Sequence, residues 1–249
     1  MLALGIDIGG SGIKGAVVDT ECGSLVSDRM RVPTPRDLSP EALAGILHNL
    51  FSDLDWKKGP VGIGFPGVIR GNTIFTAANL DKRLVGLNLE EVLDGLGSAP
   101  VRVLNDADAA GFAEMEFGAG LPYRKQGTVL LLTVGTGIGT VMFVDGVLVP
   151  NLELGHVEFN GAEAEHLVSE RTRKHEDLSW KRWAKRFSGY LEYLERLLNP
   201  DVIILGGGGV SKVGKFEKHL SIQTPWVMAN NGNRAGIIGA ALAAASRAG

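Results

Sequence analysis

The first eight residues of the chain alternate apolar positions with small or polar ones. A glycine-rich turn at residues 9–12 follows, and a second apolar run at 16–18 then leads into Asp19. Alternation with a period of two is typical of a half-buried strand. The pattern therefore predicts an antiparallel hairpin over residues 1–19, with the glycines at its tip. The apolar positions of its first strand are Leu2, Leu4, Ile6 and Ile8.

Strand and helix patterns continue along the rest of the chain. The clearest is helical: in residues 178–198 the aromatic and leucine side chains fall on one stripe, and Asn199-Pro200 ends the segment. The predicted helices cover 39–51, 89–96, 107–117, 178–198 and 236–248. The predicted strands cover 25–32, 61–65, 101–104, 128–133, 141–144 and 202–205. Residues 161–177 are polar and without a period, so we expect irregular structure there.

The opening hairpin has a second copy about 125 residues further on. A strand at 128–133 leads into the glycine turn 135–139, and a returning strand at 141–144 ends in Asp145, as the first copy ends in Asp19. Two such halves predict an α/β protein with two lobes that face one nucleotide-sized cleft. We place the first lobe at residues 1–108, joined by the C-terminal helix 236–249, and the second at 109–235.

Composition narrows the classes of function. The 249 residues are 45% hydrophobic, carry a net charge of −3 and include 35 glycines, about twice the usual share. The charge gives no reason to expect a nucleic-acid or membrane surface. Cys22 is the only cysteine, which excludes an internal disulfide and a cysteine-rich zinc site. No apolar run reaches the ~18 residues of a membrane span, so we expect a cytoplasmic protein.

The glycines of the first turn allow two interpretations. Gly10, Gly12 and Gly15 match a dinucleotide-binding fingerprint, but that motif requires a helix after the glycines, and none is predicted here. A hairpin tip that offers backbone N–H groups to a phosphate fits better, with Asp7 near enough to approach Mg²⁺ directly or through water. An ordinary hairpin turn with an aspartate at the strand end is the alternative.

Asn105 and Asp106 lie between a predicted strand and an alanine-rich helix. A sugar hydroxyl is a poor nucleophile, and an aspartate can accept its proton while the bond to phosphorus forms. The amide of Asn105 can hold neighbouring hydroxyls. Asn and Asp before a helix are also typical N-caps, so capping is the alternative, and one residue can do both.

Glu153 and His156 flank Gly155 in the segment ELGH. An acceptor and a donor three residues apart suit two adjacent sugar hydroxyls, and the glycine allows a close approach. The alternative is an ordinary hydrogen bond of a buried histidine. Zinc is not favoured, because no cysteine lies nearby to complete the ligand set.

Taken together, seven segments in this order resemble the ROK family of sugar kinases, within the actin-like ATPase and hexokinase superfamily (ribonuclease H-like fold). The resemblance implies Asp106 as general base, the two glycine hairpins on the phosphates and the last glycine loop beside the adenosine. The segments are DIGGSGIKGAVVD, GFPG, TAANLD, LNDADAAG, TVGTGIGT, ELGH and IILGGGG. The sugar-binding residues implied are Gly67, Asn79, Asn105, Asp106, Glu153, His156 and Glu165. Those implied for phosphate or nucleotide are Asp7, Gly9, Gly10, Ser11, Gly12, Lys14, Thr136, Gly137, Gly207 and Gly208.

The chain departs from many family members because residues 155–170 contain no cysteine, so no structural zinc is expected. The usual ending of that motif is missing too, and Glu165 stands in as the late sugar-binding glutamate. The chain is most similar to polyphosphate glucokinases of the family, including those that also use ATP and mannose. We therefore expect a homodimeric kinase that phosphorylates the 6-hydroxyl of glucose from polyphosphate or ATP with Mg²⁺.

Three alternatives remain. One is a strictly ATP-dependent ROK hexose kinase. The second is a sugar-sensing ROK-like regulator; such a protein needs a DNA-binding domain, whereas this sequence enters the phosphate hairpin by residue 9. The third is a nucleotide-switched structural or chaperone ATPase, which would lack the sugar-specific ELGH arrangement. Two basic clusters are candidates for holding a long polyphosphate: Lys82-Arg83, and the helix cations Lys181, Arg182, Lys185 and Arg186.

Overall fold

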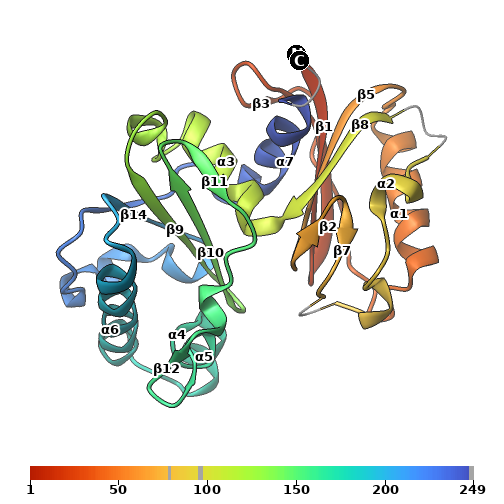
Figure 1. Ribbon diagram of the computed structural model, residues 1–249. Helices are drawn as coiled ribbons and strands as arrows, with labels where there is room; N and C mark the ends of the chain where they lie inside the picture. Colours follow the sequence, from red (N-terminus) through yellow and green to blue (C-terminus); the bar gives the residue numbers. More distant parts are fainter. Residues whose placement is uncertain (78–79, 95–97, 247–249) are drawn as a thin grey trace. The chain divides into compact units, whose positions relative to one another are not determined.

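The structure is a computed structural model that describes residues 1–77, 80–94 and 98–246 (Figure 1). The chain divides into two compact units. Unit 1 comprises Met1–Phe117 and Asn233–Gly249, and unit 2 comprises Gly118–Gly232. The predicted lobe boundary at residue 108 lies within helix α3, Asp106–Phe117. That helix belongs to unit 1 as a whole, because it packs against the C-terminal helix α7, Ala235–Ala245.

Unit 1 is built on a six-stranded sheet in the order β3-β2-β1-β5-β8, with β4 also paired to β2. Strands β1 and β2 are antiparallel, whereas β1, β5 and β8 are parallel neighbours. The strands are β1 (Leu2–Gly9), β2 (Gly12–Asp19), β3 (Ser24–Leu25), β4 (Met30–Val32), β5 (Gly59–Phe65) and β8 (Ser98–Asn105). A separate small hairpin pairs β6 (Ile69–Arg70) with β7 (Thr73–Ile74).

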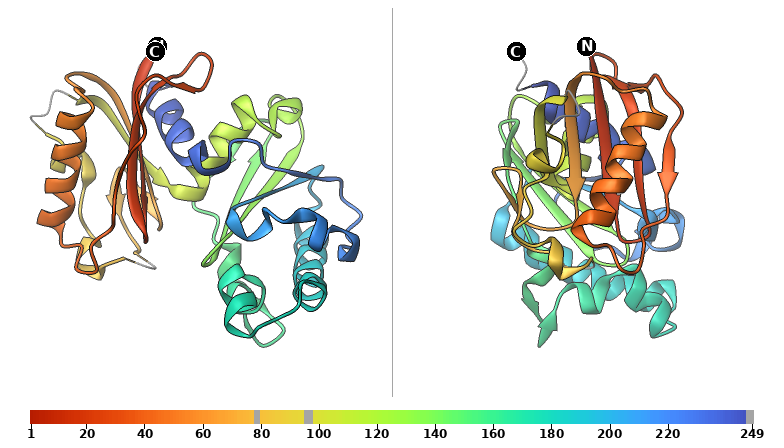
Figure 2. Two further views of the ribbon diagram at one scale, coloured as in Figure 1. Left: turned by 180° about the vertical axis from the view of Figure 1, so that it is seen from behind. Right: turned by 90° about the vertical axis from the view of Figure 1, so that its right-hand side faces the viewer.

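Helices cover both faces of this sheet (Figure 2). Helix α1 (Pro40–Asp53) begins at Ser39, whose hydroxyl accepts a hydrogen bond from the N–H of Ala42, as the sequence predicted. Its leucines pack against the alternating apolar side chains of β1 in one core cluster. Helix α7 lies on the other face, where its backbone comes so close that Gly5 and Gly62 have no room for a Cβ atom. Small residues are therefore required at this contact.

The remaining elements of unit 1 are short. The predicted helix 89–96 is only α2 (Leu89–Val92), and residues 95–97 lie outside the described part. The predicted strand 25–32 is interrupted, because only its ends, β3 and β4, pair with β2. A 3₁₀ turn, η1, spans Lys82–Leu84.

Unit 2 begins with the same type of antiparallel hairpin as unit 1. Its five-stranded sheet has the order β11-β10-β9-β14-β15, and β9 pairs with β10 antiparallel and with β14 parallel. The hairpin β9–β10 beside β14 thus has the same arrangement as β1–β2 beside β5, which confirms the internal repeat. The strands are β9 (Thr128–Val134), β10 (Ile138–Val144), β11 (Val147–Val149), β14 (Val202–Gly206) and β15 (Trp226–Met228).

Helix α6 (Trp180–Leu198) supplies most of the aromatic core of unit 2. Ser179 caps it, and Asn199 ends it in a left-handed conformation with φ 45°. Residues 161–177 are not irregular as predicted, because short elements there are held by contacts with distant parts of the unit. These elements are β13 (Ala162–Glu163), which pairs with β12 (Glu158–Phe159), α4 (Glu165–Val168) and α5 (Glu170–His175). The 3₁₀ turns are η2 (Leu121–Tyr123), η3 (Leu154–His156), η4 (Gly208–Val210), η5 (Val213–Lys215) and η6 (Glu217–His219), with η7 (Gly232–Arg234) at the unit boundary.

Across the described ranges, the helices are all too short or too polar to cross a membrane.

Candidate active site

The first glycine turn joins two strands. Gly9 and Gly12 face each other at the end of the β1–β2 ladder, and strand β2, not a helix, follows the glycines. The dinucleotide-binding interpretation therefore fails for this segment. Gly10 and Ser11 form the exposed tip, and the carbonyl of Ser11 accepts a hydrogen bond from Arg31.

Lys14 and Asp7 stand opposite each other in the same hairpin. The Lys14 Nζ atom lies 2.7 Å from Oδ2 of Asp7, and both side chains are largely buried. A Cβ atom on Gly236, at the start of α7, would stand 3.0 Å from Cγ of this carboxylate. The glycine therefore leaves space beside Asp7 that any other residue would fill.

Asn105 ends strand β8 and caps helix α3. Its Oδ1 atom accepts hydrogen bonds from the backbone N–H groups of Ala107 at 2.8 Å and Asp108 at 3.2 Å. Its Nδ2 atom donates to the carbonyl of Gly67 at 3.2 Å. The capping interpretation is thus confirmed for Asn105, and Gly67, Asn105 and Asp106 are brought together in unit 1.

Asp106 is the first residue of α3. One of its oxygens accepts the N–H of Ala107 at 2.8 Å. The positive end of the helix dipole stabilises an ionised carboxylate at this position. The predicted sugar-binding residue Asn79 lies outside the described residues.

The edge strand β8 is held by a residue that the sequence analysis did not identify. Asn72 is buried in a left-handed conformation with φ 67°. Its Oδ1 accepts the N–H of Val103 at 2.8 Å, and its Nδ2 donates to Glu90 at 2.8 Å. Asn72 therefore fixes the strand that carries Asn105. The Gly71-Asn72 pair between two apolar segments is a turn signal that points to such a position.

In unit 2, the second glycine turn and the late glycine loop lie at the same end of strand β9. The N–H of Gly135 donates to the carbonyl of Gly137 at 3.0 Å, which leaves Thr136 exposed at the tip. Gly207 has φ 86° and lies directly on the backbone of Val134, while Gly208 is exposed and has open space around its Cα. The predicted phosphate and adenosine residues of this unit are thus neighbours.

The ELGH segment is packed tightly on the second hairpin. Thr140 Oγ1 donates to the carbonyl of Leu152 at 2.7 Å and accepts the N–H of Leu154 at 3.0 Å. Gly155 has no room for a Cβ atom against the carbonyl of Ile138. The glycine therefore allows turn η3 to lie close to β10, which fixes the positions of Glu153 and His156.

Acidic side chains surround His156. Its Nδ1 atom lies 2.8 Å from Glu163 Oε2, and its Nε2 atom lies 3.7 Å from Glu153 Oε2. The imidazole is 43% exposed, so it is not the buried histidine of the alternative interpretation. The hydrogen bond to Glu163 raises the pKa of His156 and lowers the pKa of Glu163. Burial raises the pKa of Glu153, and the nearby His156 opposes that rise.

Glu165 completes this cluster from the first turn of α4. Its Oε2 atom accepts the N–H of Ile138 at 3.3 Å, beside Gly137. One ligand-type atom each of His156, Glu163 and Glu165 lies within 4.8 Å of the others. Within the cluster, Glu163 is hydrogen-bonded to His156, whereas Glu165 is held by the backbone of Ile138.

Glu163 is the main residue of this site that the sequence analysis missed. Asn160-Gly161, with φ 51° and 82°, forms the turn between β12 and β13 and places Glu163 opposite Glu158. An Asn-Gly pair between short β-type segments is a strong hairpin signal. It was available in the segment EFNGAE at residues 158–163.

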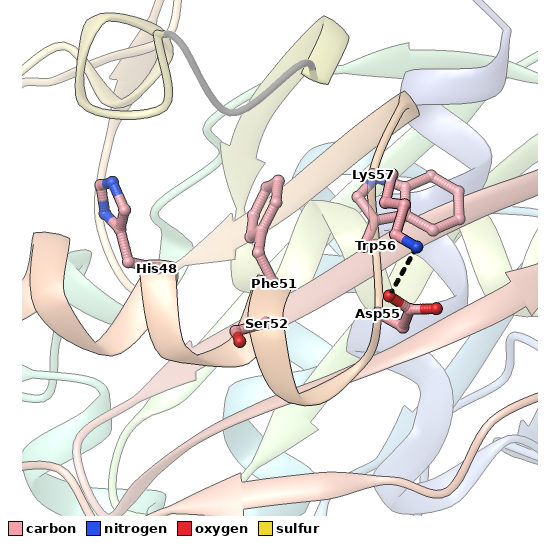
Figure 3. Close-up of a pocket in the computed structure, with 6 residues that line it drawn as sticks. All are labelled: His48, Phe51, Ser52, Asp55, Trp56 and Lys57. Carbon is pink, nitrogen blue, oxygen red and sulfur yellow. Dashed lines mark ion pairs between the residues drawn. The ribbon is translucent and has the colours of Figure 1, made fainter.

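A surface hollow of about 390 Å³ lies elsewhere in unit 1, at the end of α1 (Figure 3). It contains none of the predicted site residues, and Asp55 and Lys57 form an ion pair of 3.2 Å at its edge. Its lining is His48, Phe51, Ser52, Asp55, Trp56 and Lys57.

Comparison with known proteins places the chain in a class and then in a family. The fold is that of the actin-like ATPases and hexokinases, and the chain matches the ROK family over residues 3–167. It is 42% identical over 240 residues to a polyphosphate glucokinase of Mycobacterium tuberculosis (strain CDC 1551 / Oshkosh), covering 96% of this chain and 89% of that relative. The chain belongs to the ROK family.

Two solved structures show what this fold can support. The inorganic polyphosphate/ATP-glucomannokinase of Arthrobacter sp. strain KM matches with a TM-score of 0.91 and 41% identity, over 99% of both chains. A ROK family transcriptional regulator, a homologue of the E. coli MLC protein, matches with a TM-score of 0.72 and 15% identity, over 97% of this chain and 77% of that one. The second likeness concerns the fold alone and carries no argument about function.

Proposed function

We propose that this protein is a glucokinase that transfers a phosphoryl group from inorganic polyphosphate or ATP to the 6-hydroxyl of glucose. The observation that carries the proposal is the 42% identity to a polyphosphate glucokinase along 96% of the chain. The 41% identity to a polyphosphate/ATP-glucomannokinase supports the use of both donors, and it makes mannose a second proposed acceptor.

Asp106 is the proposed general base. A carboxylate at the first position of α3 can accept the hydroxyl proton of the sugar as the bond from O6 to phosphorus forms. The bond from phosphorus to the donor oxygen breaks in the same step, and that oxygen keeps the electron pair. The products are the sugar 6-phosphate and either ADP or a polyphosphate shortened by one unit.

In this proposal the sugar hydroxyls are bound by amide, carboxylate and imidazole groups. Asn105 is held by its cap bonds and by Gly67, so its orientation is set before the sugar arrives. Preorganised groups bind without the entropy cost of ordering them. The proposed sugar-binding residues are Gly67, Asn79, Asn105, Asp106, Glu153, His156 and Glu165.

The glycine turns and Lys14 bind the donor phosphates, and the loop after β14 lies beside the adenosine of ATP. Backbone N–H groups of such turns suit anions, and Lys14 adds a positive charge. The proposed residues are Gly9, Gly10, Ser11, Gly12, Lys14, Thr136 and Gly137 for phosphate, with Gly207 and Gly208 for the nucleotide.

Mg²⁺ is the proposed metal cofactor, and Asp7 would hold it, directly or through water, together with the donor phosphates. The residues fit this ion, since Mg²⁺ in kinases uses one or two carboxylates and keeps several waters. Lys14 contacts one oxygen of Asp7, and Gly236 lies against the same carboxylate with no Cβ atom to crowd it. When bound, Mg²⁺ neutralises phosphate charge.

Assays that combine each phosphoryl donor with each sugar acceptor test the proposal. Formation of sugar 6-phosphate is measured with glucose or mannose as acceptor and polyphosphate or ATP as donor, with and without Mg²⁺. We expect glucose phosphorylation with both donors and a strict need for a divalent cation. A protein that binds glucose but phosphorylates it with neither donor contradicts the proposal and favours a sugar-sensing role.

We also propose a cytoplasmic homodimer, on the basis of the family resemblance. Light scattering coupled to size exclusion tests the assembly, with an expected mass twice the 26.4 kDa of the chain. A monomer that retains full activity contradicts the dimer.

A further inference from the structure

Glu163 holds the imidazole ring of His156 from one side. It contacts Nδ1 at 2.8 Å, while the other ring nitrogen, Nε2, lies 3.7 Å from Glu153. We propose that Glu163 is a positioning residue that keeps the proton of His156 on Nδ1 and turns Nε2 toward the sugar hydroxyls beside Glu153. This inference rests on the sugar-binding role proposed above for His156 and Glu153.

A tight hairpin fixes the backbone position from which Glu163 reaches His156. Strands β12 and β13 are joined by the Asn160-Gly161 turn, whose two positive φ angles match the twist of a short hairpin. The N–H of Ala164 donates to the carbonyl of Val157 at 3.0 Å, which extends the pairing by one residue. The backbone of Glu163 is therefore held in register opposite Glu158, and the hydrogen bond to His156 orients its carboxylate.

Helix α6 ties the hairpin and the histidine turn to the same scaffold. The ring of Phe159, in β12, lies 5.8 Å from the rings of Tyr190 and Tyr193. The hydroxyl of buried Tyr190 donates to the carbonyl of Leu154, in η3, at 3.0 Å. Both partners of the Glu163–His156 hydrogen bond are therefore anchored to one buried side chain, so their separation is a built feature of unit 2.

The contact has a defined electrostatic result. A carboxylate can only accept, so the hydrogen on Nδ1 is held there in both the neutral and the protonated ring. Neutral His156 then offers an acceptor at Nε2, and protonated His156 offers a donor. The carboxylates facing the ring are Glu163, Glu153 and Glu165, and together they raise the pKa of His156. The protonated donor form is thus maintained to higher pH than in an isolated histidine.

Kinetic variants separate a positioning role from a merely structural one. Glu163→Ala removes the carboxylate and is expected to raise the glucose KM about 2- to 12-fold, the range for one hydrogen bond, with little change in the donor KM. Glu163→Gln keeps an acceptor but removes the charge. At low pH, where the His156 ring is protonated, the glucose KM of this variant is expected to stay near wild type. As pH rises and the ring loses its proton, the glucose KM is expected to rise, and in this variant that rise is expected at a lower pH than in wild type.

Glu158→Gln is the matched control. Glu158 lies directly across the hairpin from Glu163, is exposed, and has no hydrogen bond to His156 in the described structure. The Glu158→Gln substitution therefore removes one carboxylate from the same hairpin without changing a contact of the His156 ring. We expect wild-type glucose KM and an unchanged pH profile.

The tautomer of His156 gives a readout that is independent of activity. In ¹⁵N-histidine-labelled protein, the His156 signals are assigned by their loss in His156→Ala. We expect the Nδ1–H tautomer in the wild type and in Glu158→Gln, and a shift toward Nε2–H in Glu163→Ala. An Nε2–H tautomer in the wild type, or Glu163 variants that match Glu158→Gln in both tautomer and KM, would overturn the inference. Wild-type glucose KM in His156→Ala would instead refute the sugar-binding role on which it rests.

Discussion

Lys14 and Asp7 form an ion pair of 2.7 Å across the first hairpin, in side chains that are only 24% and 17% exposed. The pair lies two residues from the glycine tip on each strand. A lysine held in this way has a fixed position next to the N–H groups that are proposed to bind phosphate. Its ammonium retains two further N–H donors for an incoming anion.

Replacing Lys14 by Gln is therefore expected to weaken donor binding. The KM for both polyphosphate and ATP should rise about 10-fold or more, as for loss of a hydrogen bond to a charged group, while glucose binding changes little. Steady-state kinetics with each substrate varied in turn measures this. Lys57→Gln is the control, because Lys57 forms an exposed pair with Asp55 at 3.2 Å in the same unit. Equal effects of the two substitutions would remove Lys14 from the donor site.

The Asp106→Asn variant tests the general base. The amide keeps the size and a hydrogen-bond acceptor, so the cap of α3 and glucose affinity should remain, while kcat falls 10²- to 10⁴-fold. Circular dichroism, glucose titration and turnover are measured on the same preparation. Glu41→Gln, in the first turn of α1, removes a comparable helix-terminal carboxylate and should leave kcat unchanged. A wild-type kcat in Asp106→Asn would leave this aspartate with a structural role alone.

The sequence pattern could identify elements and site residues that are formed by residues close together in the chain. The β1–β2 hairpin followed from alternation and glycine spacing, and helix α6 from its apolar stripe. Asn105 and Asp106 could be selected because a strand and a helix meet there. Glu163 was missed because its meaning depends on His156, which a separate turn brings to it. Elements α4 and α5 were missed for a related reason, since four and six residues carry too little periodicity to detect.

Tyr190→Phe tests the anchor beneath the histidine turn. The change deletes the hydrogen bond to the Leu154 carbonyl, which should lower the free energy of unfolding by about 0.5–1.5 kcal/mol. Because the turn also carries His156, the glucose KM should rise more than the donor KM. Denaturant unfolding and kinetics measure the two effects.

Tyr193→Phe provides the comparison for that variant. The Tyr193 ring also packs on Phe159, at 5.8 Å, but the described structure gives its hydroxyl no hydrogen bond. We expect wild-type stability and kinetics. Loss of stability in Tyr190→Phe without any change in glucose KM would show that the anchor supports the fold and not the site.

The two basic clusters are Lys82-Arg83 and the helix cations Lys181, Arg182, Lys185 and Arg186. They differ in how far nearby carboxylates neutralise their charge. In the first cluster, Arg83 donates to both Asp37 and Asp81. In the second, Arg186 pairs with Glu176 at 2.8 Å. Lys181 and Lys185 lie on the exposed side of α6. Desolvation lowers the pKa of His219, in η6, and the nearby charges of Lys218, Lys181 and Lys185 lower it further. The second cluster therefore contains a local concentration of like charge.

That concentration makes the α6 lysines the better candidates for contacting a long polyphosphate. A polyanion that binds lysines releases counterions, so its affinity falls steeply with salt, whereas ATP ends after three phosphates. Replacing both Lys181 and Lys185 with Gln should raise the polyphosphate KM, flatten its dependence on salt and leave the ATP KM nearly unchanged. Kinetics with both donors at several salt concentrations measures this. The control replaces Lys57 and Lys58 with Gln, which changes the net charge by the same amount in unit 1. If both double variants respond alike, the effect is one of net charge and the α6 lysines do not bind the donor.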